Sequence, residues 1–192
     1  MLPKTTAGAC ALVLAASLGV SACGKQGTYK GKLQGFDEPA REGLAVPLGG
    51  LEYNVFITRE LNLRIPPDKA YYDGPEPPKG ETLYGVFLRV CNKGDKPRRS
   101  AEHFKVLDNQ DNEFEPTELP ADNSFAYHPR TLDPGKCLPE EGSVAELGPT
   151  EGAMLLFKLP VANTENRPLE LEIERPPGQG GKHEKLAFEL DI

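Results

Sequence analysis

The chain has 192 residues with 22 Lys or Arg against 29 Asp or Glu, so its formal net charge is −7. An acidic surface argues against binding to nucleic acid, which proteins contact through basic patches. The 19 prolines and 20 glycines are too many for a helical protein and are typical of short strands joined by many turns.

Residues 1–22 have the pattern of a cleaved secretory signal. Lys4 supplies a positive charge, and the apolar stretch after it is too short for a bilayer span, which needs about 20 apolar residues. The stretch ends in Val20-Ser21-Ala22-Cys23, which resembles the lipobox of bacterial lipoprotein signals. The resemblance implies cleavage before Cys23 and lipidation of its thiol, and two or more acyl chains hold a protein stably to a membrane. An ordinary cleaved signal with a chance cysteine is the alternative.

We therefore expect a protein anchored to the cell membrane by the Cys23 lipid, on the extracytoplasmic face. Residues 24–48 show no hydrophobic periodicity and carry Gly, Lys, Gln, Asp and Glu. This composition predicts a flexible tether. The expected organisation is a signal helix over 1–22, a lipidated N-terminus and tether over 23–48, and one domain over 49–192.

The cysteines predict one disulfide. Cys10 leaves with the signal and Cys23 receives the lipid, so Cys91 and Cys137 remain as an even pair in an oxidising compartment. A bond between them closes a loop that the chain-entropy account values at about 4 kcal/mol. Two free thiols, or half of a metal site, are the alternatives.

The patterned region begins at Leu51–Ile57, and Thr82–Cys91 is the clearest strand. Its alternate residues Tyr84, Val86, Leu88 and Val90 are apolar, so one face is expected to be buried. Further strands are expected at 103–107, 113–115, 142–147, 153–160, 169–174 and 186–192. The first two of these flank a polar turn and predict a hairpin. The mostly apolar sequence of 153–160 predicts a central strand. Seven to nine short strands predict an all-β fold, an immunoglobulin-like antiparallel β-sandwich.

Several of these segments resemble a known family. The run Tyr84–Lys96 is similar to the strand, Asn, Gly-Asp signature of bacterial lipoproteins with an immunoglobulin-like domain of the DUF4352 type. Phe104–Asp108 with Phe114–Pro116, Leu132–Gly135 and Leu155–Pro160 resemble its later motifs in the same order. The turn without Gly and the Cys91/Cys137 pair depart from the family pattern. The resemblance implies a fold and a location, and no catalytic residues.

Metal-ligating patterns are weak in this sequence. His103, His128 and His183 lie far apart along the chain without ligand spacing, although strands can bring distant residues together. Asp108, Asp111 and Glu113 place oxygen ligands at short spacing, as in a calcium loop, but Asp and Asn are also common turn residues. We expect no metal and no cofactor, and leave calcium binding at the 108–113 turn open.

Two segments carry aromatic residues suited to contacting a partner. The Pro-rich loop Ile65–Gly80 displays Tyr71 and Tyr72, and a later irregular stretch carries Phe125 and Tyr127. Exposed tyrosines on a stiff loop offer apolar contact area at low entropy cost. The same side chains can instead fold down and cap one end of the sandwich.

No serine elbow, phosphate loop or paired catalytic group stands out, so we do not expect an enzyme. The sequence favours a non-catalytic module that binds an unknown protein or envelope component at the cell surface. The alternative is an extracytoplasmic carrier of a small ligand or of a metal ion such as calcium or copper. That carrier would require the histidines or the 108–113 turn to converge in space.

Overall fold

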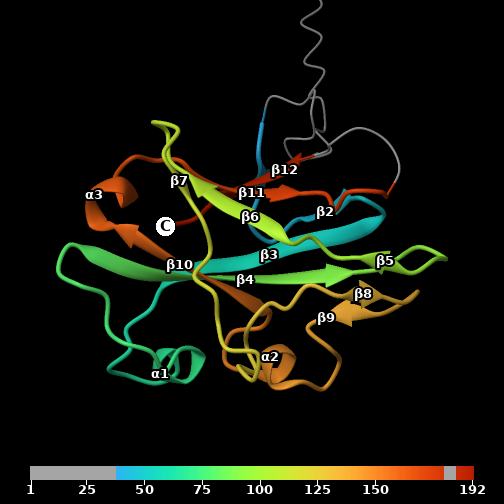
Figure 1. Ribbon diagram of the computed structural model, residues 1–192, viewed down its shortest axis with the longest axis horizontal. Helices are drawn as coiled ribbons and strands as arrows, with labels where there is room; N and C mark the ends of the chain where they lie inside the picture. Colours follow the sequence, from blue (N-terminus) through green and yellow to red (C-terminus); the bar gives the residue numbers. More distant parts are fainter. Residues whose placement is uncertain (1–37, 180–184) are drawn as a thin grey trace, which may run out of the picture.

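Strands with alternating apolar and polar residues build two facing sheets in the computed structural model, which describes residues 38–179 and 185–192 (Figure 1). Seven of the strands in these ranges have four residues or more, and five have two. Two layers of mainly antiparallel strands with few helices make a β-sandwich, as the sequence predicted.

The first sheet has the strand order β1-β12-β11-β6-β7. Its members are β1 (Ala40–Arg41), β12 (Lys185–Leu190), β11 (Leu169–Glu174), β6 (His103–Leu107) and β7 (Glu113–Phe114). All neighbours are antiparallel except β1, which runs parallel to β12. The expected hairpin is confirmed as β6–β7.

The second sheet has the strand order β10-β4-β3-β2. Its members are β10 (Ala153–Pro160), β4 (Glu81–Cys91), β3 (Leu51–Glu60) and β2 (Ala45–Leu48), and β9 (Cys137–Leu138) pairs with the end of β4. Cys91 and Cys137 are register partners across β4 and β9, and they form the expected disulfide.

Short elements complete the described chain. A two-stranded ribbon joins β5 (Arg98–Arg99) to β8 (Thr131–Leu132), and the helices are α1 (Asp68–Tyr71), α2 (Val144–Leu147) and α3 (Val161–Thr164). In Figure 1, α1 and α2 lie on the side of the second sheet that faces away from β11 and β12.

The main core fills the space between the two sheets. Tyr84, Val86, Leu88 and Val90 of β4 belong to it, as their period-two spacing predicted. The leucines and isoleucine of β11 face them, while the intervening glutamates remain partly exposed. Each fully buried aliphatic side chain contributes about 1.5–3 kcal/mol relative to an exposed one.

A second cluster covers the opposite face of the second sheet. It joins Leu83 and Phe87 of β4 to Met154 and Leu156 of β10, beneath α1 and the chain around Phe125. The strand β4 is therefore buried on both faces, whereas its sequence pattern predicted one. This cluster gives the short helices a place to pack.

The domain begins earlier than expected. Ala40 in β1 and Val46 and Leu48 in β2 are buried in the main core, so the predicted tether boundary at residue 48 is wrong. Only two to four residues form each of these two strands, which is too few for a visible alternation of apolar and polar residues.

The predicted signal helix and Cys23 lie outside the described residues. Within the described ranges, no helix has the length and apolar character needed to cross a bilayer.

The strand β10 is an edge strand, although its apolar sequence predicted a central one. Residues 117–127 run along its free edge: Thr117 N–H donates to Leu156 O (2.6 Å) and Tyr127 N–H donates to Met154 O (2.9 Å). Isolated bridges rather than a full strand cover this edge. Apolar residues therefore line both faces of β10 without a second long neighbour.

Residues 144–147, within the strand expected at 142–147, form the helix α2 instead. Ser143 Oγ accepts the Glu146 N–H (3.3 Å), which caps the helix. The Glu146 carboxylate returns to accept the Gly142 N–H (2.6 Å). This reciprocal pattern resembles a capping box, whose Ser-x-x-Glu spacing was present in the sequence.

Candidate binding site

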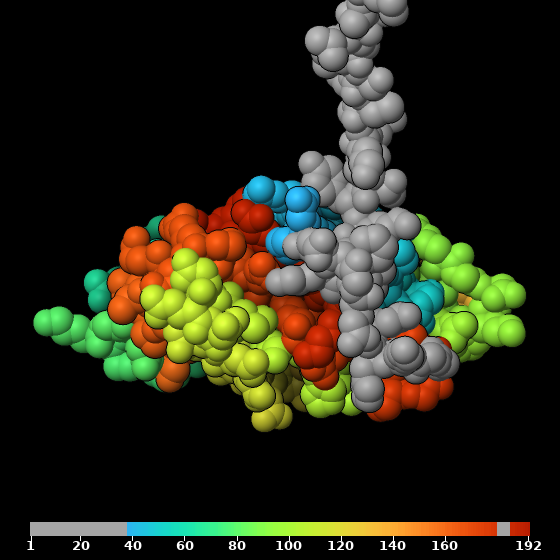
Figure 2. Space-filling model, turned by 90° about the horizontal axis from the view of Figure 1, so that it is seen from above, coloured from blue at the N-terminus to red at the C-terminus, as the bar shows by residue number. Residues whose placement is uncertain are grey.

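One buried carboxylate holds the turn between β6 and β7. Asp108 Oδ1 accepts the backbone N–H groups of Gln110 and Asn112, both at 2.9 Å. Asp108 Oδ2 accepts the side-chain amides of Asn112 (2.8 Å), Asn163 and Asn166 (both 2.9 Å). Figure 2 shows this turn, in yellow-green, against the orange segment that includes α3.

The electrostatics of Asp108 follow from these contacts. Burial opposes ionisation of the carboxyl group, but the hydrogen bonds from Asn112, Asn163 and Asn166 outweigh it and hold its pKa well below the usual range. The carboxylate is charged at neutral pH and serves as an anchor for the hairpin.

The calcium hypothesis for the 108–113 turn gains no support from this arrangement. Calcium requires oxygen atoms with available lone pairs, and five N–H donors already point at the Asp108 carboxylate. Within residues 38–179 and 185–192, no group of three His, Cys, Asp or Glu side chains is placed to hold a metal ion.

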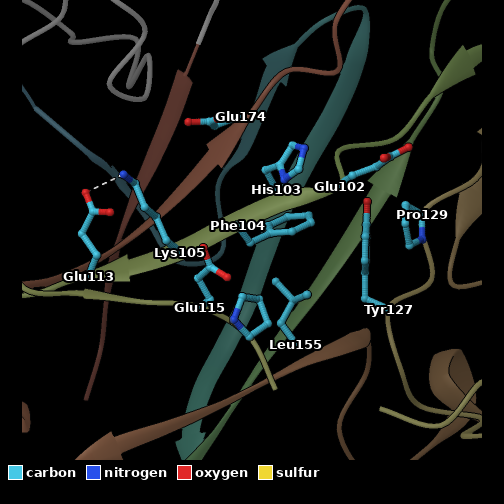
Figure 3. A pocket seen from close by; sticks show the side chains of 11 residues that line it. Glu102, His103, Phe104, Lys105, Glu113, Glu115, Tyr127, Pro129, Leu155 and Glu174 are labelled. Carbon is cyan, nitrogen blue, oxygen red and sulfur yellow. Dashed lines mark hydrogen bonds and ion pairs between the residues drawn. The ribbon is translucent and has the colours of Figure 1, made fainter. Parts of the chain in front are cut away.

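A groove of ≈ 430 Å³ opens between the edges of the two sheets, where β6 and β7 face β10 (Figure 3). This groove is the candidate binding site. Its lining comes from both sheets and from the 127–129 segment, namely Glu102, His103, Phe104, Lys105, Glu113, Glu115, Pro116, Tyr127, Pro129, Leu155 and Glu174.

The floor of the groove is apolar. Phe104 of β6, Leu155 of β10 and Tyr127 are buried members of the main core that reach the groove at its base. The Phe104 and Tyr127 rings meet edge to face, with centroids 4.9 Å apart. This edge-to-face packing is favourable and helps to hold the two rings in place at the base of the groove.

The tyrosine hydroxyls near the floor brace the scaffold. Tyr127 Oη donates to Ala101 O (2.9 Å), and Ala101 N–H donates to Tyr53 Oη (2.8 Å). Burial raises the pKa of both phenols above their ordinary value. Both therefore stay protonated at neutral pH and serve as structural hydrogen-bonding groups.

The rim of the groove carries four glutamates and one lysine. Lys105 pairs with Glu113 (2.6 Å), and the hydrogen bond between them raises the pKa of the lysine. Glu102 pairs with Arg99, and Glu174 pairs with Lys185 (3.0 Å), whose hydrogen bond lowers the pKa of Glu174.

Glu115 is the remaining glutamate of the rim. Its side chain is exposed and has no charged partner among the described residues. The groove therefore presents one uncompensated negative charge beside its apolar floor (Figure 3).

The strand β6 has an open edge on the groove side. β7 pairs only with the last two residues of β6. After Phe114 the chain crosses to the second sheet, where Thr117 bridges Leu156 of β10. Residues 103–105 therefore have no strand beside them on this side within the described ranges, which leaves the N–H and C=O of Phe104 facing the groove.

The aromatic residues expected to contact a partner lie elsewhere than expected. Tyr71 is fully buried, packed edge to face on Phe87 (5.0 Å) and Phe125 (4.9 Å). Tyr72 and Phe125 are half-buried against the same second cluster. Tyr127 is buried in the floor of the groove, so neither Tyr71 nor Tyr127 is an exposed anchor.

The burial of Tyr71 has a local cause. The Asp68 carboxylate in α1 accepts from Arg59 (2.6 Å) and from the Asn62 N–H (2.9 Å), which fixes α1 against the second sheet. Tyr71 at the end of α1 then points into the second cluster. Tyr71 therefore folds down onto the protein, but it covers the outer face of the second sheet and not one end of the sandwich, as the alternative had expected.

A second cavity, of ≈ 670 Å³, lies beside Cys137. It is larger than the groove, and its lining likewise mixes charged and apolar side chains. Arg89 pairs with Glu146 and Glu151, and Arg130 pairs with Glu140 (2.8 Å), so most of its charges are already matched. We favour the groove because it combines an apolar floor with an open strand edge.

The histidines do not form a common site in the described residues. His103 lines the groove, His128 is exposed, and His183 lies outside the described residues. Because His183 is not described, the hypothesis that all three histidines converge to carry a metal ion stays a prediction.

Sequence reasoning missed the groove. Phe104, Glu115 and Leu155 come from three separate segments, and only the tertiary fold brings them together. One local signal was present: Pro116 directly follows Glu115, and a proline cannot continue a strand ladder through its own nitrogen. It marks where the chain leaves β6.

Comparisons with known proteins identify the fold alone. No family model and no curated protein matches the sequence. The structure of the yjhA protein from Bacillus subtilis is similar, with a TM-score of 0.52 at 12% identity over 79% of this chain and 99% of that one. A functionally unknown protein from Listeria monocytogenes EGD-e has a TM-score of 0.50 at 10% identity, over 80% and 84% of the two chains.

An uncharacterised β-sandwich protein from Clostridium difficile 630 is also found, with a TM-score of 0.42 at 10% identity, over 81% of this chain and 98% of that one. The first two similarities are consistent with the two-sheet architecture described above. The names of these three proteins indicate no ligand and no activity.

Proposed function

We propose that the chain is a lipid-anchored, non-catalytic binding module on the extracytoplasmic face of the membrane, and that the groove beside β6 is its binding surface. The ligand belongs to a protein or to another envelope component. The observation that carries the binding proposal is the groove itself, in which an apolar floor lies next to unpaired strand edge.

The chemistry of the titratable groups supports a non-catalytic role. Tyr53, Asp108 and Tyr127 have the largest pKa shifts, and each is hydrogen-bonded into the scaffold. On the groove rim, the smaller shifts of Lys105 and Glu174 come from their hydrogen bonds to Glu113 and Lys185. A catalytic site instead needs shifted groups that face a substrate. The net charge of −7 supports a ligand other than nucleic acid.

The anchor is tested by changing its cysteine. Wild-type protein should partition with the membrane fraction, and Cys23→Ser should move to the soluble fraction because it cannot accept the lipid. Cys10→Ser is the matched control in the same segment and should stay with the membrane. Retention of Cys23→Ser in the membrane would contradict the anchor.

Binding is tested on the membrane-anchored protein in cells. A photo-crosslinking amino acid at position 129, on the groove wall, should give an adduct of discrete mass. The same amino acid at Asp122, an exposed residue outside the groove lining, is the control. Absence of adducts at position 129, and equally at every rim position tried, would overturn the proposed function.

A further inference from the structure

We infer that the groove binds an extended, positively charged peptide segment, which adds as a strand to the open edge of β6. This inference rests on the proposed function, because it names the class of ligand for the same groove. Adding a strand to an exposed edge is an established mode of peptide recognition in which backbone bonds give affinity and side-chain pockets give specificity.

The geometry of β6 defines which backbone groups are available. Asp108 N–H donates to Asn112 O (3.1 Å) on the β7 side of the strand. Backbone groups point to the same edge at every second residue of an antiparallel ladder. The N–H and C=O of Val106 and Phe104 therefore face that edge too, and at Phe104 the chain of β7 has already departed.

The chain that follows β7 has already left β6 at the position that would pair with Phe104. Val106 pairs with Phe114, so continued register would place Pro116 opposite Phe104. Proline has no N–H to donate. One donor and one acceptor of Phe104 are thus left for an incoming strand, within the described part of the chain.

The charge of the groove selects the ligand class. Glu102, Glu113 and Glu174 are each matched by a cation of this chain, whereas Glu115 has no such partner in the described ranges. A lysine or arginine of the ligand would complete the rim next to Glu115. An acidic ligand would instead add to an existing excess of carboxylates.

The floor sets the second requirement. Successive side chains of an extended peptide point to opposite sides, so a residue directed to the floor is followed by one directed outward. An apolar side chain over Phe104, Tyr127 and Leu155 next to a basic one at the rim satisfies both surfaces. The preferred ligand therefore alternates apolar and basic residues.

The first experiment uses the full mature chain with Cys23→Ser, in solution, and a nine-residue peptide of alternating lysine and valine. We expect binding by calorimetry, and at least about tenfold weaker binding when glutamate replaces lysine. Glu115→Gln should weaken binding of the lysine peptide about threefold or more. Glu118→Gln, the same change at an exposed residue outside the groove, should leave it unchanged.

A second pair of probes separates strand addition from charge attraction. N-methylation of alternate residues removes backbone donors from one edge of the peptide only. Two peptides are compared, one methylated at the odd-numbered residues and one at the even-numbered residues. The peptide methylated on the edge that faces β6 should bind at least about tenfold more weakly, while the other should bind like the unmethylated peptide. Addition of the unmethylated peptide should also slow hydrogen exchange at the Phe104 amide. Equal affinity of the two methylated peptides, or equal affinity for lysine and glutamate peptides, overturns the inference.

Other occupants of the groove give different results. The chain's own lysines before the described domain could occupy the groove; these are Lys25, Lys30 and Lys32. In that case, replacing them by Gln raises the affinity for the peptide, and the inference of a separate ligand is overturned. A concentration-dependent dimer that the peptide dissociates would assign the groove to a second copy of the chain, and would overturn the inference too. Unchanged affinity and a monomer support it.

Failure of the inference and failure of the proposed function are distinguishable. Adducts at position 129 in cells, combined with no binding of the lysine peptide, would reject the cationic strand and retain a binding module of another specificity. Absence of both would reject the groove as a binding surface altogether.

Discussion

Asp108 Oδ2 accepts a hydrogen bond from the Asn166 side chain at 2.9 Å, which ties the turn after β6 to the segment between α3 and β11. These two parts of the chain are 58 residues apart. The contact holds the β6–β7 hairpin, and with it one wall of the groove, against the segment that leads into β11.

Replacing the Asp108 carboxylate should destabilise the fold. Asp108→Ala removes the acceptor of five part-buried hydrogen bonds and leaves their donors unpaired, so we expect a loss of about 2–4 kcal/mol in the free energy of unfolding. Chemical denaturation monitored by circular dichroism measures it. Asp111→Asn, in the same turn but exposed, should change stability by less than about 0.5 kcal/mol. Equal losses in the two variants would contradict the anchoring role.

The same carboxylate should make stability depend on acid. The pKa of Asp108 is lowered in the folded state relative to about 3.9 in an unfolded chain, so the folded state favours the charged form. Its contribution is fully present above the unfolded pKa and is lost as the pH falls from about 5 toward the lower folded pKa. Denaturation midpoints between pH 7 and pH 2 should fall less steeply in Asp108→Asn than in wild type. Parallel curves would show that other carboxylates cause the acid dependence.

The disulfide should contribute substantially to stability. The Cys91–Cys137 bond spans 46 residues, and the chain-entropy account gives about 4 kcal/mol for a loop of this length. The double change Cys91→Ala with Cys137→Ala should lower the unfolding free energy by about 2–4 kcal/mol. Mass spectrometry should find both thiols resistant to alkylation until reduction. Alkylation of both cysteines in the unreduced protein would disprove the bond.

Two substitutions of Tyr71 distinguish the contribution of its ring to stability from that of its hydroxyl. The ring packs on Phe87 and Phe125, whereas the buried Oη finds no hydrogen-bond partner among the described residues. Tyr71→Phe should therefore be neutral or stabilising by up to about 1 kcal/mol. Tyr71→Ala should cost about 3–5 kcal/mol through the cavity that it leaves. Thermal unfolding of both variants tests this, and a large loss in Tyr71→Phe would reveal a missing partner for the hydroxyl.

Local patterns were sufficient to predict the long strands. Period-two alternation in β4, β11 and β12 marks the residues that fill the main core, and the polar run after Leu107 marks the hairpin. The disulfide followed from counting cysteines in an expected oxidising compartment. Each of these features depends on neighbouring residues or on composition, which a single sequence contains.

Features that depend on distant segments were not predictable in this way. The second cluster requires α1 and the chain around Phe125 to fold against the far face of β4, so Tyr71 looked like an exposed loop residue. β1 is only two residues long and is specified by pairing with β12, more than 140 residues later. The groove depends on three such segments at once.

The helix α2 was predictable and was missed. Ser143 and Glu146 have the spacing of a capping pair, but the apolar residues between and after them resembled a short strand. Hydrophobic pattern alone cannot separate a helix from a strand over so few residues.

The position of β4 between two hydrophobic clusters has a consequence for unfolding. Leu88 on one face belongs to the cluster between the sheets, and Phe87 on the other belongs to the cluster beneath α1. Loss of either layer exposes one side of the same strand and weakens the support of the other. We therefore expect both layers to melt together in a single cooperative transition, with β4 among the last amides to exchange with solvent.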